Sequence, residues 1–427
     1  MSNENGKKVQ AFNLGVRGWI IVALGFITAY AYSCMTSDIL NVTVPVWTEM
    51  GLNSNLIYGV VTVGCVIGLI VQIICGKLTK KISLRVFWAV FMLLSGVMII
   101  IWGLAKTNAA YAIPYLVIFA CLVTSTYSFS MNIMANWFPK KRGVALGVIT
   151  AGYPLSAATG VKICANFISS EIGMKGFYFM MGVIVIIVGL LVLAIVRDFP
   201  EECGLYPDNN RNYDFEQAKA EHEKQLEYLK TSYWTIGNLL KNVRMWMVLL
   251  IVSLCGFVAQ GMMASFLNYF VTKGYEPGAI MGMLAICGLT AIPLSVFWGW
   301  VDVKFGSKVA GMCIYSLAVV MIIFQLSNVH ILHMIGLPLI GSLLGGSVNM
   351  MGSFCSSIWG RYDFQNAYRI VAPAVTFCCG IGVTAIGLIG TNVSYNAAFL
   401  VVFALLVISF VLMCFLKTSP IEAPDKK

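Results

Sequence analysis

The sequence predicts an all-α polytopic membrane protein with twelve transmembrane helices, and three observations lead to this class. Of the 427 residues, 59% are hydrophobic and only 11% are charged, whereas soluble domains have about 25% charged residues. Long apolar runs recur along the chain, and a bilayer core about 30 Å thick needs about 20 helical residues to cross it. The cations gather in alternate loops between these runs, which is the charge bias of cytoplasmic loops.

The apolar runs divide into twelve predicted spans. The first run is too long for a signal peptide and has no small-residue cleavage site, so we expect it to be retained as a helix. The boundaries, to within about 2–4 residues, are 17–44, 55–75, 84–104, 109–137, 143–168, 176–196, 244–271, 278–300, 308–328, 332–358, 366–390 and 395–416.

The distribution of positive charge predicts the orientation. Of the 28 Lys and Arg residues, 24 lie in segments on one face, Lys106, Lys175 and Lys273 lie on the other, and Lys162 lies inside a span. The crowded face is therefore expected to be cytoplasmic. We expect the protein to lie in the cell (plasma or inner) membrane with both termini in the cytoplasm. Loop cations account for the net charge of +10, so no nucleic-acid partner is expected. The 13 cysteines show no paired spacing, which predicts buried free thiols and no metal site.

The stretch from Asn136 to Lys162 combines three signals. One apolar run ends at Trp137–Pro139, three cations follow at Lys140–Arg142, and a second apolar run begins at Gly143. The cations assign the turn to the cytoplasm. The glycines of the second run predict close packing against neighbouring helices. These are Gly143, Gly147, Gly152 and Gly160.

The longest polar stretch, Arg197–Asn242, separates six spans from six. We therefore predict an N-terminal six-helix bundle at 1–196, a cytoplasmic linker at 197–243 and a C-terminal six-helix bundle at 244–427. Within the linker, Tyr213–Lys230 is rich in helix-forming residues and predicts a surface helix. Two interpretations of this segment stay open, a plain linker and a regulatory element.

Two loops at corresponding places in the halves are alike. The first runs from Gly76 to Arg85, and the second carries Gly299, Asp302, Lys304 and Gly306. In both, a glycine ends a span and basic residues follow at turn spacing, where cations stabilise helix C-termini. Repeated halves predict a secondary transporter with its site at their interface.

These loops resemble the loop 2–3 signature of the major facilitator superfamily and its loop 8–9 counterpart. The second loop is the better match, because Lys80 stands in the first where the family usually has an acid. The segments Trp137–Gly152 and Pro200–Asp208 resemble the oxalate/formate antiporter and monocarboxylate transporter branches. The resemblance implies the major facilitator fold, with twelve helices in two six-helix pseudo-repeats.

Two ionisable residues lie inside predicted spans and are functional candidates for that reason. Lys162 lies roughly 28 Å along its helix from Gly143, and Asp38 roughly 31 Å from Arg17. The superfamily's packing makes these two helices neighbours, which implies an Asp38–Lys162 ion pair. We expect Lys162 to attract a substrate carboxylate and Asp38 to couple protons. The alternatives are a lysine that snorkels to the headgroups and an acid at a helix end.

Polar residues complete the predicted substrate site. Tyr30, Tyr127 and Tyr153 lie near mid-membrane, where a hydroxyl can bind an anion while the ring packs on apolar substrate. Gln260 and Asn349 come from the second half. Arg361 and Arg369 flank the eleventh span and are interpreted as topology signals. A site with one cation, Lys162, suits a monocarboxylate better than a dicarboxylate.

The sequence thus predicts a secondary active transporter of an organic anion, working by rocker-switch alternating access with proton symport or anion exchange. The expected partners are this small molecule and the lipid bilayer, and a monomer without cofactors is expected. No catalytic constellation is present, so no enzyme is predicted. The alternatives are a carrier of a cationic or neutral solute using Asp38, and a transporter-like sensor that does not transport.

Overall fold

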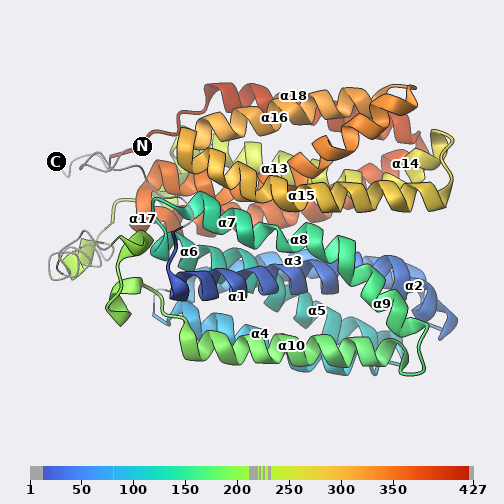
Figure 1. Ribbon diagram of the computed structural model, residues 1–427, viewed down its shortest axis with the longest axis horizontal. Coiled ribbons are helices and arrows are strands. Elements are labelled where there is room, and N and C mark those ends of the chain that lie inside the picture. The colour runs from blue at the N-terminus through green and yellow to red at the C-terminus, as the bar shows by residue number, and fades with distance from the viewer. Residues whose placement is uncertain are drawn as a thin grey trace.

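The computed structural model describes residues 13–79, 81–210, 220, 223–224, 227–228 and 232–422, and these residues form helices and connecting turns. The long helices run side by side along the longest axis (Figure 1). In this part of the chain, eleven helices are long and apolar enough to cross a membrane. One of them, α17 (His330–Asn392), contains Gly360 at φ 73°, ψ −173°, which is not helical. The chain reverses there, so α17 makes two passes, and the predicted all-α fold with twelve spans is confirmed.

Three of the first six passes contain a wide helical turn. The elements are α1 (Val16–Ser33), η1 (Cys34–Asp38), α2 (Leu40–Glu49), α3 (Ser54–Leu78), α4 (Leu84–Trp102), α5 (Asn108–Thr124), η2 (Ser125–Ser130), α6 (Met131–Trp137), α7 (Arg142–Thr150), α8 (Gly152–Leu155), η3 (Ser156–Gly160), α9 (Val161–Ile168) and α10 (Gly173–Ile195). The turns η1, η2 and η3 are π-helical, a geometry that is frequent at functional sites. Asp38 and Tyr127 lie in two of them.

The last six passes follow a docked connecting segment. The elements are η4 (Pro200–Cys203), η5 (Pro207–Asn209), α12 (Ile236–Leu240), α13 (Val243–Ala264), α14 (Phe266–Thr272), α15 (Pro277–Phe305), α16 (Ser307–Leu326), α17 and α18 (Tyr395–Phe415). Local sequence explains several helix ends. Asn242 and Ser394 cap α13 and α18 with side-chain oxygens, and Gly306, at φ 90°, separates α15 from α16.

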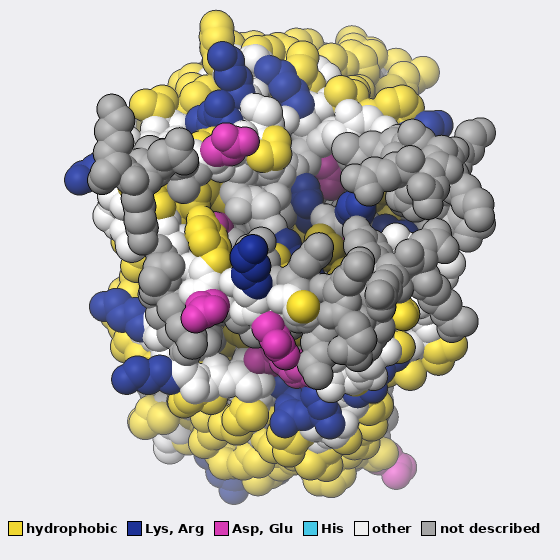
Figure 2. Space-filling model, turned by 90° about the vertical axis from the view of Figure 1, so that its left-hand side faces the viewer, with side chains coloured by type: hydrophobic (Ala, Val, Ile, Leu, Met, Phe, Trp, Pro, Cys, Tyr) yellow, Lys and Arg dark blue, Asp and Glu magenta, His cyan; other side chains and the backbone are white. Residues whose placement is uncertain are grey.

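The two ends of the helix bundle differ in charge. We call the end that carries Lys140–Arg142, the segment Asp198–Asp208 and Arg361 the linker face, and the opposite end the far face. Lys and Arg side chains gather on the linker face (Figure 2). The predicted surface helix at Tyr213–Lys230 lies outside the described residues except for five positions, and Lys80 lies outside them too.

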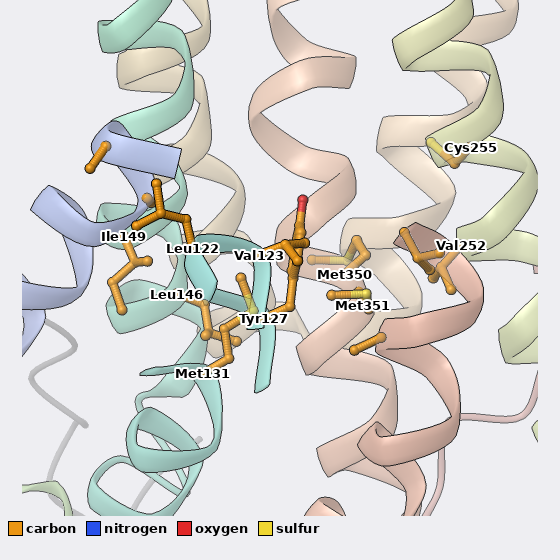
Figure 3. Close-up of a cluster of buried hydrophobic side chains, with 14 of the residues drawn as sticks. Leu122, Val123, Tyr127, Met131, Leu146, Ile149, Val252, Cys255, Met350 and Met351 are labelled. Carbon is orange, nitrogen blue, oxygen red and sulfur yellow. The ribbon is translucent and has the colours of Figure 1, made fainter. Parts of the chain in front are cut away.

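The sides of the bundle are apolar, as a bilayer requires. Large hydrophobic side chains such as Ile70, Phe179, Leu190 and Phe415 are exposed, and a soluble protein rarely exposes so much apolar surface. The interior is apolar as well. Leu122, Val123, Leu146 and Ile149 of the first half lie there opposite Val252, Met350 and Met351 of the second (Figure 3).

The two halves pack together near the linker face and diverge toward the far face. The helix α15 packs on α7, α8 and η3, and α17 packs on α3, α6 and α7. The contact continues as far as Gly288 of α15, where a Cβ would lie 3.2 Å from the Pro154 carbonyl oxygen, and α9 follows η3 beyond this point toward the far face. In Figure 1, α9 bends away from α15 in the same region.

Candidate functional site

Aromatic side chains form a cluster where the halves meet. The rings of Tyr127 and Tyr153 are stacked with centroids 6.3 Å apart, and the Tyr32 ring meets them edge-on at 5.7 and 6.1 Å. The hydroxyl of Tyr153 is buried and makes no hydrogen bond in the described structure. The structure thus brings together two of the three predicted tyrosines and adds Tyr32. Tyr30 instead shares a hydrogen bond of 3.1 Å with Thr159.

Asp38 lies in η1, and its described partners are hydroxyl groups. Its carboxylate accepts hydrogen bonds from Ser33 at 2.9 Å and from Ser156 at 2.6 Å, and a longer one from Ser37. Ser156 belongs to η3, so the two wide turns of the first and fifth passes meet at this acid. A hydroxyl group can donate a hydrogen bond to an ionised carboxylate or accept one from a protonated carboxyl group. These contacts are therefore compatible with either protonation state of Asp38.

The predicted ion pair between Asp38 and Lys162 does not form, so that prediction was wrong. Lys162 is exposed on α9. It lies four residues beyond Ala158, on the helix face that contacts Gly288 of α15. Because the halves diverge above Gly288, Lys162 lies beside the place where they separate. The helical rise predicted a depth for Lys162 but not the direction of its side chain.

Asn349 and Gln260, the predicted substrate ligands of the second half, lie in different surroundings. Asn349 is buried and donates to the carbonyl oxygen of Ser295 at 3.0 Å. Ser295 shares a 2.6 Å hydrogen bond with Thr150 and donates to the Gly147 carbonyl. Asn349 is thus part of a polar junction between the halves. Gln260 is exposed on α13.

The second repeated loop closes the linker face by direct backbone contact. Gly299 of α15 touches Gly143 of α7, and a Cβ on Gly143 would lie 2.6 Å from the Gly299 carbonyl oxygen. Asp302 is buried and accepts from Ser353 at 2.7 Å and from Ser307. Asp302 thus bonds to serines rather than to a cation directly.

A chain of hydrogen bonds nevertheless connects Asp302 with a cation of the other half. Ser307 shares a hydrogen bond of 2.6 Å with Ser357, and Ser357 accepts from Arg142 at 2.6 Å. Lys304 is exposed and lies over the Trp300 ring at 4.6 Å. Of the two basic positions, the structure therefore places only Arg142 in the contact between halves.

The first repeated loop is held by an acid of the linker. Asp198 accepts from the backbone N–H groups of Leu84 and Arg85 at 2.9 and 2.8 Å, and from the hydroxyl of Ser83. A carboxylate at a helix N-terminus satisfies the open N–H groups of the first turn. This role could not be found from the sequence, because 113 to 115 residues separate the partners.

Two further linker acids bind the loops around them. Asp208 accepts from the backbone N–H groups of Lys140 and Lys141 at 3.0 and 2.8 Å. Burial raises the pKa of Asp208, while these N–H groups act in the opposite direction. Glu201 forms a salt bridge of 2.9 Å with Arg361, with exposures of 3% and 13%. The described start of the linker, Asp198–Asp208, is therefore docked against the helix bundle.

Arg361 and Arg369, interpreted from the sequence as topology signals, both lie in contacts between the halves. Arg361 also donates to the carbonyl oxygen of Asn136 at 2.9 Å. Arg369 packs against Gly76 of α3. Partly buried Arg369 thus lies in the packing between α17 and α3, near the linker face.

The described cysteines are all free, and eight of the thirteen are buried while the other five are partly buried. Among the described residues, no three His, Cys, Asp or Glu side chains lie close enough together to hold a metal ion.

The fold and the central cluster define a helical membrane protein of twelve spans with polar residues between two sets of helices. Residues 26–368 match the family model of the Major Facilitator Superfamily. The match covers most of the chain, and the chain belongs to the Major Facilitator Superfamily.

Relatives and solved structures agree with this assignment. The chain is 26% identical over 298 residues to the oxalate:formate antiporter of Oxalobacter formigenes, which covers 68% of this chain and 65% of that protein. It is 24% identical to the glycerol-3-phosphate transporter of Bacillus subtilis (strain 168), over 40% of this chain and 39% of that protein. The chain thus spans less than two thirds of the length of these relatives.

Similar folds occur in solved structures at 14% identity. The proton:xylose symporter XylE has a TM-score of 0.77, with 93% of this chain and 96% of that chain covered. The human organic anion transporter MFSD10 (TETRAN) has a TM-score of 0.70, with 93% and 99% covered. At this identity the likeness supports the fold alone.

Proposed function

We propose that the chain is a secondary active transporter of an organic anion, with a monocarboxylate as the best-fitting class. The observation that carries this proposal is the Tyr153 hydroxyl, which is buried beside Tyr127 without a hydrogen-bond partner in the described structure. Buried polar groups nearly always have a partner. A bound carboxylate would accept this hydrogen bond while its apolar part packs on the tyrosine rings.

The curated relatives support an anionic substrate. One is named for oxalate and formate, and another for glycerol 3-phosphate. Their names describe those proteins, and we extend only the shared chemical class to this chain. Exposed Lys162, beside the place where the halves separate, supplies a positive charge along the path to the tyrosines.

Alternating access would move the two bundles, 1–196 and 244–427, against each other around the central site. The linker face, which the cation bias assigns to the cytoplasm, is closed by the contact of Gly143 with Gly299 and by the salt bridge of Glu201 with Arg361. The divergence of the halves toward the far face supports a state that faces outward. We place the protein as a monomer in the cell membrane with both termini inside.

Asp38 is the proposed proton-coupling group. It lies in the π-helical turn of the first pass and accepts a hydrogen bond from Ser156 of the fifth, and the hydroxyls around it can serve either protonation state. Proton symport is therefore favoured over anion exchange. Removing the titratable group while keeping its shape tests this role.

The first test is a thermal-shift screen of the purified protein against formate, lactate, benzoate and oxalate, followed by counterflow of the labelled acid in proteoliposomes. We expect a monocarboxylate to stabilise the protein and to exchange. Lys162→Met should weaken uptake of the acid from the far face, and Asp38→Asn should keep binding but lose dependence on a pH gradient.

Three outcomes contradict the proposal. Stabilisation and counterflow only by an organic cation or a neutral solute would favour the carrier that uses Asp38. Binding without counterflow would favour a sensor. Parental transport of the acid by Lys162→Met would show that the lysine only snorkels.

A further inference from the structure

One difference between the two repeated loops is the acid Asp302, which has no counterpart in the first loop. Asp302 stands three residues after Gly299, whereas Thr79 and Lys80 stand three and four residues after Gly76. Each glycine lies where a helix of one half crosses a helix of the other, α15 over α7 and α3 over α17. The first crossing thus lacks the acid of the second.

Each crossing also carries an arginine. At the second crossing, Arg142 is connected to Asp302 by hydrogen bonds through Ser357 and Ser307. At the first crossing, Arg369 lies so close to Gly76 that a Cβ there would be 2.9 Å from its Cγ. Its Nε is buried without a hydrogen-bond partner, and no described acid forms an ion pair with it.

A small cavity lies beside Arg369 and is lined by polar groups of both halves. Its lining includes Thr79, Ser128, Asn132, Gln365 and Tyr368. In this closed state the cavity has room for about one water molecule. The Oδ1 atom of Asn132 is also buried without a partner in the described structure.

Arg369 is partly buried, and its buried Nε needs an anion or water as partner, because an unpaired polar group in the interior is costly. Arginine matches a carboxylate with two parallel hydrogen bonds, and the hydroxyl of Ser128 supplies a further donor. Arg369 lies eight residues, or roughly 12 Å, along its helix from Arg361. It therefore lies between the tyrosine cluster and the linker face.

We propose that Arg369 and the polar groups around it form a second carboxylate site, which the transported anion occupies on the linker-face side once that face has opened. This inference rests on the proposed function. In the closed state the site is too small for a carboxylate, so it binds anions only when α3 and α17 separate. The anion then takes the place that Asp302 has at the other crossing.

The test compares transport from the two sides in right-side-out and inside-out vesicles, with labelled formate, lactate and benzoate as probes. Arg369→Gln removes the charge, and Arg369→Lys keeps the charge but loses the paired hydrogen bonds. Arg244→Gln is the matched control, because this arginine also lies at the linker face but bonds to a backbone carbonyl, that of Ser419.

We expect Arg369→Gln to raise the half-saturating concentration from the linker face at least tenfold and from the far face less than twofold. Arg369→Lys should give an intermediate value, and Arg244→Gln should match the parent. Retained transport from the far face shows that the variant is folded. A purely structural arginine would change the maximal rate or the thermal stability without this difference between the two sides.

The remaining outcomes distinguish a transported acid from a soluble counter-ion at Arg369. They also distinguish failure of the Arg369 site from failure of the proposed function. If inorganic phosphate stabilises the parent but not Arg369→Gln, and transport constants stay unchanged, the site holds a soluble counter-ion and the inference is wrong. If the parent transports an acid and Arg369→Gln keeps the parental linker-face constant, only the Arg369 site fails. If the parent transports none of the acids, the proposed function fails and this inference with it.

Discussion

The salt bridge between Glu201 and Arg361 is predicted to hold the linker face closed. Glu201 belongs to the connecting segment and Arg361 begins the eleventh pass, so opening the face must separate them. Two hydrogen bonds of 2.9 and 3.1 Å join the pair. Breaking a fully buried pair by removing one partner costs about 3–5 kcal/mol.

The cost for Glu201→Gln should be smaller, at about 2 kcal/mol. Arg361 is partly exposed and keeps its bond to the Asn136 carbonyl and its contacts with the rings of Phe199 and Tyr362. A charged hydrogen bond contributes about 1.5–3 kcal/mol, and glutamine retains part of that. Since 1.4 kcal/mol is a factor of ten, the ratio of closed to open molecules should fall about 30-fold.

The assay uses a native cysteine that is buried in the closed state. Cys355 is fully buried, one turn beyond Gly352, which packs against Leu146 of the other half. Opening of the linker face should expose it to N-ethylmaleimide, and peptide mass spectrometry measures its rate of alkylation. Buried Cys287, on α15 within the second half, is the internal reference.

We expect Glu201→Gln to increase the Cys355 rate by about tenfold or more, without a change at Cys287. Glu202→Gln is the matched control, because Glu202 is the next residue and is exposed. Exchanging the charges, with Glu201→Arg and Arg361→Glu together, should restore part of the protection. Equal Cys355 rates in the parent and both glutamine variants would refute the role of the salt bridge.

Three further predictions concern the linker face. Gly143→Ala should hold this face open in the same alkylation assay, because a Cβ there would lie 2.6 Å from the Gly299 carbonyl oxygen. Gly282→Ala, where a Cβ meets nothing within 4 Å, should behave like the parent, and equal rates in both variants would contradict the packing argument. Half-exposed Cys203 should react with an impermeant maleimide in inside-out vesicles only, and labelling in intact cells would reverse the orientation. Asp198→Asn should lower the free energy of unfolding by about 1 kcal/mol, as loss of a helix cap does, and an unchanged thermal midpoint would contradict that role.

The sequence determined the class of this protein because the bilayer imposes strong local rules. Each span must be apolar for about 20 residues, so the succession of apolar runs along the chain predicted twelve passes. The glycine at the crossing of α7 and α15 was also recognisable, because close packing of helices needs small residues. The depth of Lys162 followed from the helical rise, and its place on the fifth pass was correct.

The direction in which each polar side chain points, and the residues that it contacts, were decided only by the tertiary structure. A rise of 1.5 Å per residue gives depth but not the face of a helix in a bundle whose neighbours are unknown. For this reason the predicted pair of Asp38 and Lys162 was wrong, and Asn349 proved to bind a backbone carbonyl.

The contacts of the linker acids and of the two arginines of the eleventh pass also could not be predicted from the sequence. Glu201 and Arg361 are 160 residues apart, and no local pattern indicates which distant cation an acid will meet. Arg369 resembled an ordinary loop cation in the sequence. Only the packing of α17 against α3 left it beside Gly76 without an acid, because the energy of a charge depends on what surrounds it in space.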